Sequence, residues 1–222
     1  MARPLVAELV GPAGAGKSAL SQRLVGRVGA LRASVWKLPR GWWLLNAVRS
    51  LPALAALCLV TRSLPWEDMR QIVRLRTLRQ LLDRRTARQA PLVVLDEGPV
   101  FALAYMRLFG YERWRRNAPA PWWHRALHEW VGALDLVVQL DAPDAVLASR
   151  IRTRDKQHRV KQSSDAEIDA FTAAYRSAYT LVIDTLVAET GARVTTLQSD
   201  GEGADRTAER LLELLKGNGH GE

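Results

Sequence analysis

The sequence has little cysteine, little lysine and no signal-peptide pattern. Each of these absences excludes some kinds of protein. Cys58 is the only cysteine in 222 residues, which excludes an internal disulfide and favours a reducing compartment. The first ten residues, MARPLVAELV, run directly into a glycine-rich motif, too early for the apolar stretch and cleavage site of a signal peptide. We therefore expect a cytoplasmic protein.

Lysine is scarce because the basic residues are almost all arginine. The chain has 27 arginines and 5 lysines, and its formal net charge is +9. Planar guanidinium groups suit phosphate and carboxylate, so the composition favours anionic partners, although an arginine-rich genome would give the same count without a function. No recognisable nucleic-acid-binding module is present, and we expect no nucleic-acid partner.

A long apolar run without interruption is also lacking. The segment 41–60, GWWLLNAVRSLPALAALCLV, contains Asn46, Arg49 and Pro52. Its uninterrupted part, 51–60, would rise only about 15 Å as a helix, half of the roughly 30 Å that a bilayer requires. We expect no membrane span here, and interpret the segment as a buried helix or the wall of a substrate pocket.

Short apolar runs alternate with longer helical patterns along the chain. This alternation is typical of a parallel sheet covered by helices, and 222 residues fit one such domain, so we predict a single three-layer α/β domain over 1–222. The five predicted strands are Leu5–Val10, Ala33–Trp36, Leu92–Leu95, Leu136–Leu140 and Arg193–Leu197.

Two helical segments are well marked. Ser164 and Glu167 form a capping-box pattern that opens a helix, and Gly191 ends it. The aromatic stripe of this helix, Phe171, Tyr175 and Tyr179, favours the core over a ligand site. The segment 66–89 is amphipathic with a basic face, which is either solvated or turned toward a substrate.

A phosphate-binding loop follows the first strand. Gly11-Pro-Ala-Gly-Ala-Gly-Lys-Ser18 matches GxxxxGK[ST] in full, between an apolar strand and a helical pattern. Backbone N–H groups of such a loop surround phosphates, Lys17 reaches the β- and γ-phosphates, and the Ser18 hydroxyl ligates Mg²⁺. We expect ATP and Mg²⁺ as cofactors, and the nucleotide-binding residues are Gly11, Ala13, Gly14, Ala15, Gly16, Lys17, Ser18 and Ala19.

Two acidic residues, Asp96 and Glu97, follow the third predicted strand. A carboxylate in this position ligates the Mg²⁺ shell opposite the loop serine. We expect Asp96 to serve the metal and Glu97 to face the acceptor, because adjacent residues at a strand end point apart. Either acid can act as general base toward an acceptor hydroxyl.

With the loop, Asp96 and the segment Leu140-Asp-Ala-Pro-Asp-Ala-Val-Leu-Ala-Ser-Arg-Ile-Arg-Thr-Arg154 in view, the chain resembles the thymidylate kinase and deoxynucleoside kinase group of P-loop kinases. The resemblance covers most of the chain. It implies a P-loop NTPase sandwich with a short lid at about 154–164, in which Arg150, Arg154 and Arg159 stabilise the transferred phosphoryl group. The loop 198–201 looks like the family's loop beside the adenine base.

The chain departs from this family on the acceptor side. The second strand is followed by Trp36-Lys-Leu-Pro-Arg40, where the family commonly has an acid, and Asp96 is followed by Glu97-Gly-Pro, where it commonly has an arginine. The acceptor region, about 36–130, holds all eight tryptophans. Trp36, Lys37 and Arg40 are candidate substrate residues, and we expect a small acceptor that is anionic or aromatic.

These observations predict an ATP-dependent small-molecule kinase, acting on a nucleoside, a nucleotide or another small metabolite. The alternative is a P-loop switch or assembly ATPase that uses Asp96 and Glu97 for hydrolysis. A nucleotide sensor without turnover needs only the loop. The sequence leaves open the acceptor, and whether the chain forms a homodimer.

Overall fold

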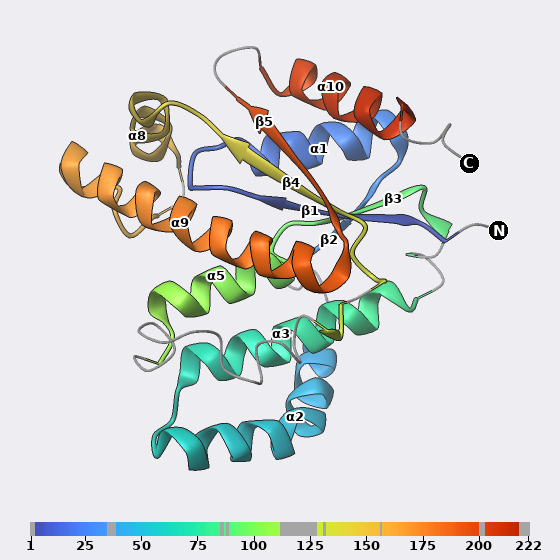
Figure 1. Cartoon of the computed structure of the whole chain (residues 1–222), viewed down its shortest axis with the longest axis vertical. Helices are drawn as coiled ribbons and strands as arrows, with labels where there is room; N and C mark the ends of the chain where they lie inside the picture. Colours follow the sequence, from blue (N-terminus) through green and yellow to red (C-terminus); the bar gives the residue numbers. More distant parts are fainter. Residues whose placement is uncertain are drawn as a thin grey trace.

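A computed structural model describes residues 3–34, 39–84, 87, 89–111, 128–130, 132–155, 157–199 and 203–217. Five parallel strands form one sheet in the order β2-β3-β1-β4-β5 (Figure 1). They are β1 (Leu5–Val10), β2 (Leu31–Ala33), β3 (Leu92–Leu95), β4 (Leu136–Asp141) and β5 (Arg193–Gln198). The predicted five-stranded parallel sheet is confirmed.

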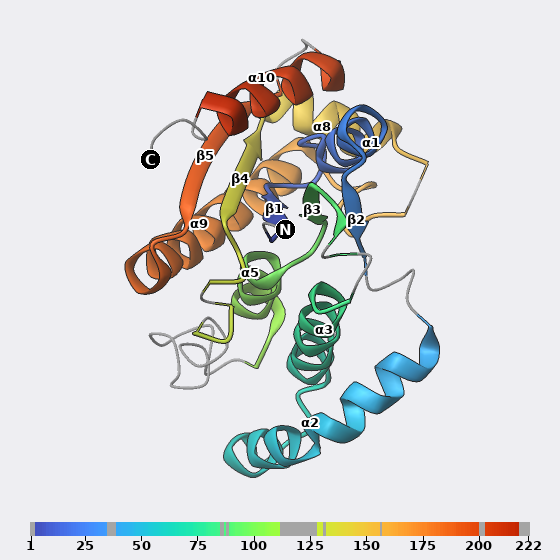
Figure 2. The ribbon, with the colours of Figure 1, turned by 90° about the vertical axis from the view of Figure 1, so that its right-hand side faces the viewer.

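Helices cover both faces of the sheet. On one face lie α1 (Lys17–Val28) and α10 (Gly203–Gly217), and on the other lie α5 (Pro99–Phe109), α9 (Asp165–Thr190) and α3 (Trp66–Leu82) (Figures 1 and 2). The helix α8 (Asp144–Thr153) lies beyond the carboxyl ends of the strands, and α2 (Arg40–Thr61) packs on α3, away from the sheet. The result is the predicted three-layer α/β sandwich.

Side chains alternate between the two faces of the sheet along each strand, and the hydrophobic core is therefore divided into two clusters, one on each face. On β1, Val6 and Val10 belong to the cluster under α5 and α9, whereas Ala7 and Leu9 belong to the cluster under α1 and α10. Successive side chains of a strand point to opposite faces, so an apolar strand buried on both sides supplies both cores.

Four strands and one helix match the sequence prediction closely. Ser164 caps α9 and Glu167 closes the capping box, and Gly191 ends the helix with a φ of 64°. The predicted second strand, 33–36, starts two residues late: β2 begins at Leu31, which pairs with Val93, and residues 35 and 36 lie outside the described part of the chain. Its position depends on pairing with β3, which local sequence does not show.

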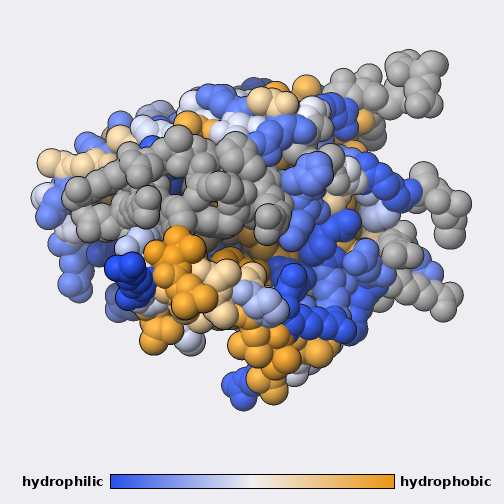
Figure 3. All heavy atoms as spheres, turned by 60° about the horizontal axis from the view of Figure 1, so that its bottom comes forward, coloured by the Kyte–Doolittle hydropathy of each residue, from blue (hydrophilic) through white to orange (hydrophobic). Residues whose placement is uncertain are grey.

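The expectation of a buried helix at 41–60 was wrong. The segment does form a helix, α2, but only one stripe of it is buried, against α3. Hydrophobic side chains on its outer side are exposed, and hydrophobic residues gather on this face of the molecule (Figure 3). Within the described residues, α2 is the one helix with the length and composition to cross a membrane.

Glu8, in the centre of β1, is a fully buried carboxylate that holds α5 in place. Its oxygens accept hydrogen bonds from Val100 N (3.0 Å) and Phe101 N (2.8 Å), in the first turn of α5. Burial raises the pKa of Glu8 to about 7, although the helix amides act in the opposite direction. Gly98 fits beside the carboxylate because it has no Cβ.

Replacing Gly98 with alanine should therefore destabilise the fold. A Cβ at this position would lie 2.7 Å from Glu8 Cδ. We expect Gly98→Ala to lower the free energy of unfolding by about 1–3 kcal/mol in urea denaturation, as overpacking does. The control is Gly26→Ala, where nothing lies within 4 Å in the exposed part of α1, and which should raise stability by about 0.5–1 kcal/mol. Equal stability of the two variants would contradict this packing.

Burial of Glu8 also predicts a pH dependence. Between its ordinary pKa of 4.5 and the folded value of about 7, the unfolded chain has released a proton that the folded chain retains. Stability should therefore fall as the pH rises through this window, by up to about 3 kcal/mol from this group. Urea denaturation at pH 5 and pH 8 should show the fall in the wild type and not in Glu8→Gln. Parallel pH profiles would contradict the raised pKa.

Candidate active site

The phosphate-binding loop lies between β1 and the N-terminus of α1. Gly11 has a φ of 141°, and a Cβ on it would lie 2.0 Å from the carbonyl oxygen of Leu140 in β4. Gly16, with a φ of 87°, is the residue before α1. Only glycine fits at Gly11, because its backbone passes so close to the neighbouring strand. The loop therefore turns tightly enough to aim the helix N-terminus at an anion.

The side chain of Lys17 folds back over the phosphate-binding loop. Its ammonium donates hydrogen bonds to the carbonyl oxygens of Gly11 (2.7 Å) and Pro12 (2.8 Å). Burial lowers the pKa of Lys17 to about 8, with a smaller contribution from the charge of Arg154, while Asp96 opposes both. The side chain remains mainly protonated at pH 7 and provides a positive charge at the mouth of the loop.

Asp96 comes directly after β3 and lines the cavity at the loop. Its Oδ2 accepts a hydrogen bond from Arg32 Nε of β2, at 2.5 Å. Its Oδ1 is buried, and in the described part of the chain it has no hydrogen-bond partner. Arg32 was not identified from the sequence. The free oxygen gives Asp96 the capacity to bind a further cation or donor.

Glu97, the neighbour of Asp96, forms an ion pair with Arg74 of α3. Arg74 is only 6% exposed, and its guanidinium lies 5.3 Å from the ring centroid of Phe101. Burial lowers the pKa of Arg74 to about 10, which leaves it charged at neutral pH. Arg74 is therefore not part of a solvated basic face but is buried behind Glu97 and Phe101, two residues that line the cavity.

A cavity of about 780 Å³ joins these groups at the carboxyl edge of the sheet. Aromatic side chains of α5 and α9 form one wall, and Phe171, Tyr175 and Tyr179 are among them. Tyr179 also belongs to the core, as expected for this stripe, and Tyr175 packs against it. The residues that line the cavity are Gly11, Ala13, Gly14, Gly16, Lys17, Ser18, Ala19, Arg32, Ser34, Asp96, Glu97, Phe101, Arg150, Arg154, His158, Phe171, Tyr175 and Tyr179.

The three arginines predicted to stabilise the phosphoryl group lie in different places. Arg154, at the end of α8, lines the cavity. Arg150 bridges the loop and the segment after β5, donating to Gly14 O (3.1 Å) and to Ser199 Oγ and O (3.0 and 2.7 Å). Arg159 lies outside the cavity lining, 4.2 Å from the centroid of Phe109.

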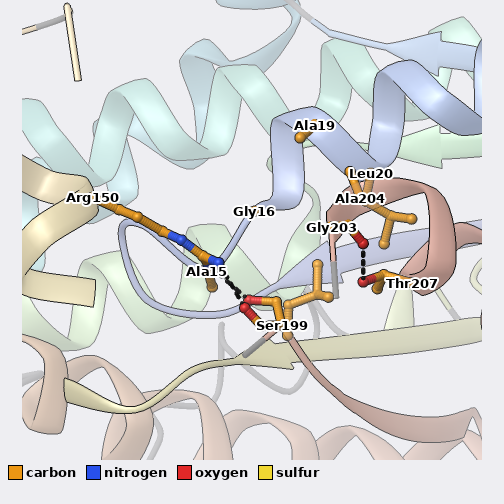
Figure 4. Close-up of a pocket in the computed structure, with 10 residues that line it drawn as sticks. Ala15, Gly16, Ala19, Leu20, Arg150, Ser199, Gly203, Ala204 and Thr207 are labelled. Carbon is orange, nitrogen blue, oxygen red and sulfur yellow. Dashed lines mark hydrogen bonds between the residues drawn. The ribbon is translucent and has the colours of Figure 1, made fainter. Parts of the chain in front are cut away.

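A second cavity, of about 290 Å³, lies beyond Arg150 (Figure 4). It is walled by the loop and start of α1 on one side and by the turn into α10 on the other. Arg150, Gly16 and Ala19 line both cavities. The residues that line the smaller one are Ala15, Gly16, Ala19, Leu20, Leu140, Arg150, Ser199, Gly203, Ala204 and Thr207.

Of the three predicted substrate residues the structure describes only Arg40, and Arg40 does not line the cavity. Trp36 and Lys37 lie outside the described residues, and Arg40 is an exposed residue at the start of α2. Of the tryptophans that the structure describes, Trp130 is buried in the core and Trp66 is 69% exposed.

No protein-family model matches the sequence, and no curated protein matches it. Solved structures with a similar fold include deoxyadenosine kinase from M. mycoides (15% identity, TM-score 0.56, covering 96% of this chain and 100% of that one). Thymidylate kinase from Candida albicans is similar at 14% identity and TM-score 0.58, covering 97% and 92%. Shikimate kinase from Acinetobacter baumannii is similar at 18% identity and TM-score 0.51, covering 98% and 96%. The chain therefore has the α/β fold of the P-loop small-molecule kinases over nearly its whole length.

Proposed function

We propose that this protein is an ATP-dependent phosphotransferase that acts on a small metabolite. The observation that carries the proposal is the 780 Å³ cavity, which joins the phosphate-binding loop to two carboxylates, three arginines and an aromatic wall. Such a cavity has room for a triphosphate end and an acceptor together. Placing the two reactants side by side is the main task of phosphoryl transfer.

ATP fits across the two cavities. Its triphosphate would bind at Gly11–Ser18 and Lys17, and its base would enter the smaller cavity beside Ser199. Arg150, which lines both, would then lie between base and phosphates. The smaller cavity is largely apolar and suits a planar base.

The residues present also suit Mg²⁺. Ser18 and Asp96 both line the larger cavity, and Asp96 Oδ1 is buried without a partner in the described part of the chain. Mg²⁺ prefers oxygen ligands and usually binds through one or two protein groups, with waters and phosphate oxygens completing its shell. When bound, the ion would supply charge neutralisation for the phosphates.

The acceptor would lie on the side of Glu97 and Phe101. Glu97 is the carboxylate available to take a proton from an acceptor hydroxyl, and the buried charge of Arg74 holds it in place. The aromatic wall would pack against a ring or another apolar body. The similar structures include enzymes named for a nucleoside, a nucleotide and shikimate, so the fold leaves the acceptor open.

Arg154 and Arg159, the two arginines of the predicted lid, would reach the phosphates at different stages of the reaction. Arg154 already faces the cavity, where it would stabilise charge on the transferred group. Arg159 lies on Phe109 and donates a hydrogen bond to Tyr105 Oη at 3.4 Å. To reach the phosphates, Arg159 must leave these contacts, which requires the 154–164 segment to move when the nucleotide binds.

Lys17→Ala should abolish tight ATP binding. The ammonium is the charge closest to the loop, and we expect the dissociation constant measured by calorimetry to rise by at least about tenfold, the effect of about 1.4 kcal/mol. Arg27→Ala, which removes a cation at the other end of α1, is the matched control and should bind ATP normally. Unchanged ATP affinity in a folded Lys17→Ala variant would contradict nucleotide binding at this loop.

Transfer can be separated from hydrolysis with Glu97→Gln. A screen of nucleosides, nucleotides and sugar-like hydroxy acids with labelled ATP should yield one labelled product in the wild type. The variant should bind ATP as before and transfer about 10²–10⁴ times more slowly, as loss of a general base does. An ATPase predicts the opposite pattern: an empty acceptor screen, phosphate release by the wild type, and ATP retained unhydrolysed by the variant.

A further inference from the structure

The outer side of α2 is the most extensive exposed apolar surface among the described residues. Twelve large hydrophobic side chains are exposed in the described part of the chain, and eight of them lie between residues 44 and 66. These eight are 42–79% exposed, whereas the other four are scattered and no more than 42% exposed. Figure 3 shows hydrophobic residues gathered on this face. The α2 face consists of Leu44, Leu45, Val48, Leu51, Leu59, Val60, Leu64 and Trp66.

The inner side of α2 buries three polar residues, Asn46, Ser50 and Thr61, beside two leucines, which is an unusually polar contact for a surface helix. Asn46 Nδ2 donates to Gln80 Oε1 of α3 at 2.7 Å, and Arg76 of α3 donates to Ser50 Oγ at 3.2 Å. Thr61, also buried, donates to Leu57 O at 2.9 Å. Polar groups between helices and apolar groups outside are typical of helices that contact lipid, because hydrocarbon provides no hydrogen-bond partner.

The charged residues of α2 and of the turn that follows it are all basic. Residues 40–66 contain three arginines and no acidic residue. Arg40, Arg49 and Arg62 are all exposed, and none forms an ion pair within the described part of the chain. Residues 40–84, which span α2 and α3, contain eight arginines and three acidic residues, a net +5 out of +9 for the whole chain.

We propose that the α2 face docks on an anionic lipid bilayer. Exposed leucines and valines would enter the interface, Trp66 would lie at the headgroup level, and the arginines beside them would contact anionic headgroups. A second copy of the chain fits less well, because a symmetric contact through this face would bring the arginines of both copies together.

The helix would lie on the bilayer and not cross it. Its 22 residues rise about 33 Å, enough to span, but its inner stripe is held on α3 by the hydrogen bonds of Asn46 and Ser50. α3 in turn packs on α5 in the body of the domain. Pro52 interrupts the helix, and Figures 1 and 2 show that α2 changes direction along its length.

Vesicle co-sedimentation tests the proposal without reference to catalysis. The full chain should bind vesicles in which about a third of the lipid is phosphatidylglycerol at least about tenfold more tightly than vesicles of phosphatidylcholine alone, and high salt should weaken the binding. Leu51→Glu/Leu59→Glu should reduce binding by at least about tenfold. The matched control is Val194→Glu/Leu214→Glu, which adds the same charge at two exposed apolar sites elsewhere and should bind nearly as the wild type does.

Circular dichroism and ATP binding establish that both double variants are folded. Equal loss of binding in the two variants would show that net charge alone matters and would overturn a specific face. Equal binding to both kinds of vesicle would overturn the role of anionic lipid. Absence of vesicle binding, together with a wild-type dimer that Leu51→Glu/Leu59→Glu converts to a monomer in light scattering, would assign the face to a second copy.

Discussion

The candidate site depends on the contact between the Glu8 carboxylate and the first turn of α5. Glu8 lies in the centre of the sheet, and its two hydrogen bonds to backbone N–H groups fix where α5 begins. The turn that carries Asp96 and Glu97 ends at Gly98, directly against this carboxylate. A buried acid is costly unless it is hydrogen-bonded, so the helix N-terminus and Glu8 stabilise each other. The aromatic wall of α5 takes its position from the same contact.

The charged side chains that line the larger cavity are mainly cationic, which favours an anionic ligand. Four cationic side chains line it, Lys17, Arg32, Arg150 and Arg154, against the carboxylates of Asp96 and Glu97. Each carboxylate is already paired with an arginine, Arg32 or Arg74, which fixes its direction. The positive charge in excess faces the loop, where backbone N–H groups favour phosphate. This balance suits a triphosphate with one metal ion better than it suits a neutral ligand.

The sequence predicted the parts of the site that are continuous in the chain. The loop Gly11–Ser18, the acids after β3 and the capping box of α9 are local patterns with local causes. Arg32 and Glu8 were not found, and Arg74 was placed only within a basic face, because each takes its position through packing between elements distant in sequence. β2 was misplaced for the same reason, since a three-residue strand is defined by its partner. Whether the predicted residues act in catalysis stays a prediction.

The helix α2 differs from the helices around the sheet in what it buries and what it exposes. Around the sheet, apolar side chains are inside and arginines outside, as water requires. In α2 and α3 the pattern differs: seven of the eleven buried polar residues of the described chain lie there, beside buried leucines of both helices, and so do most of the exposed large hydrophobic residues. Hydropathy along the sequence cannot show this, because it counts apolar residues without saying which side of a helix is covered. The proposed contact with lipid therefore rests on one side of one helix, where exposed apolar side chains lie over polar contacts to α3.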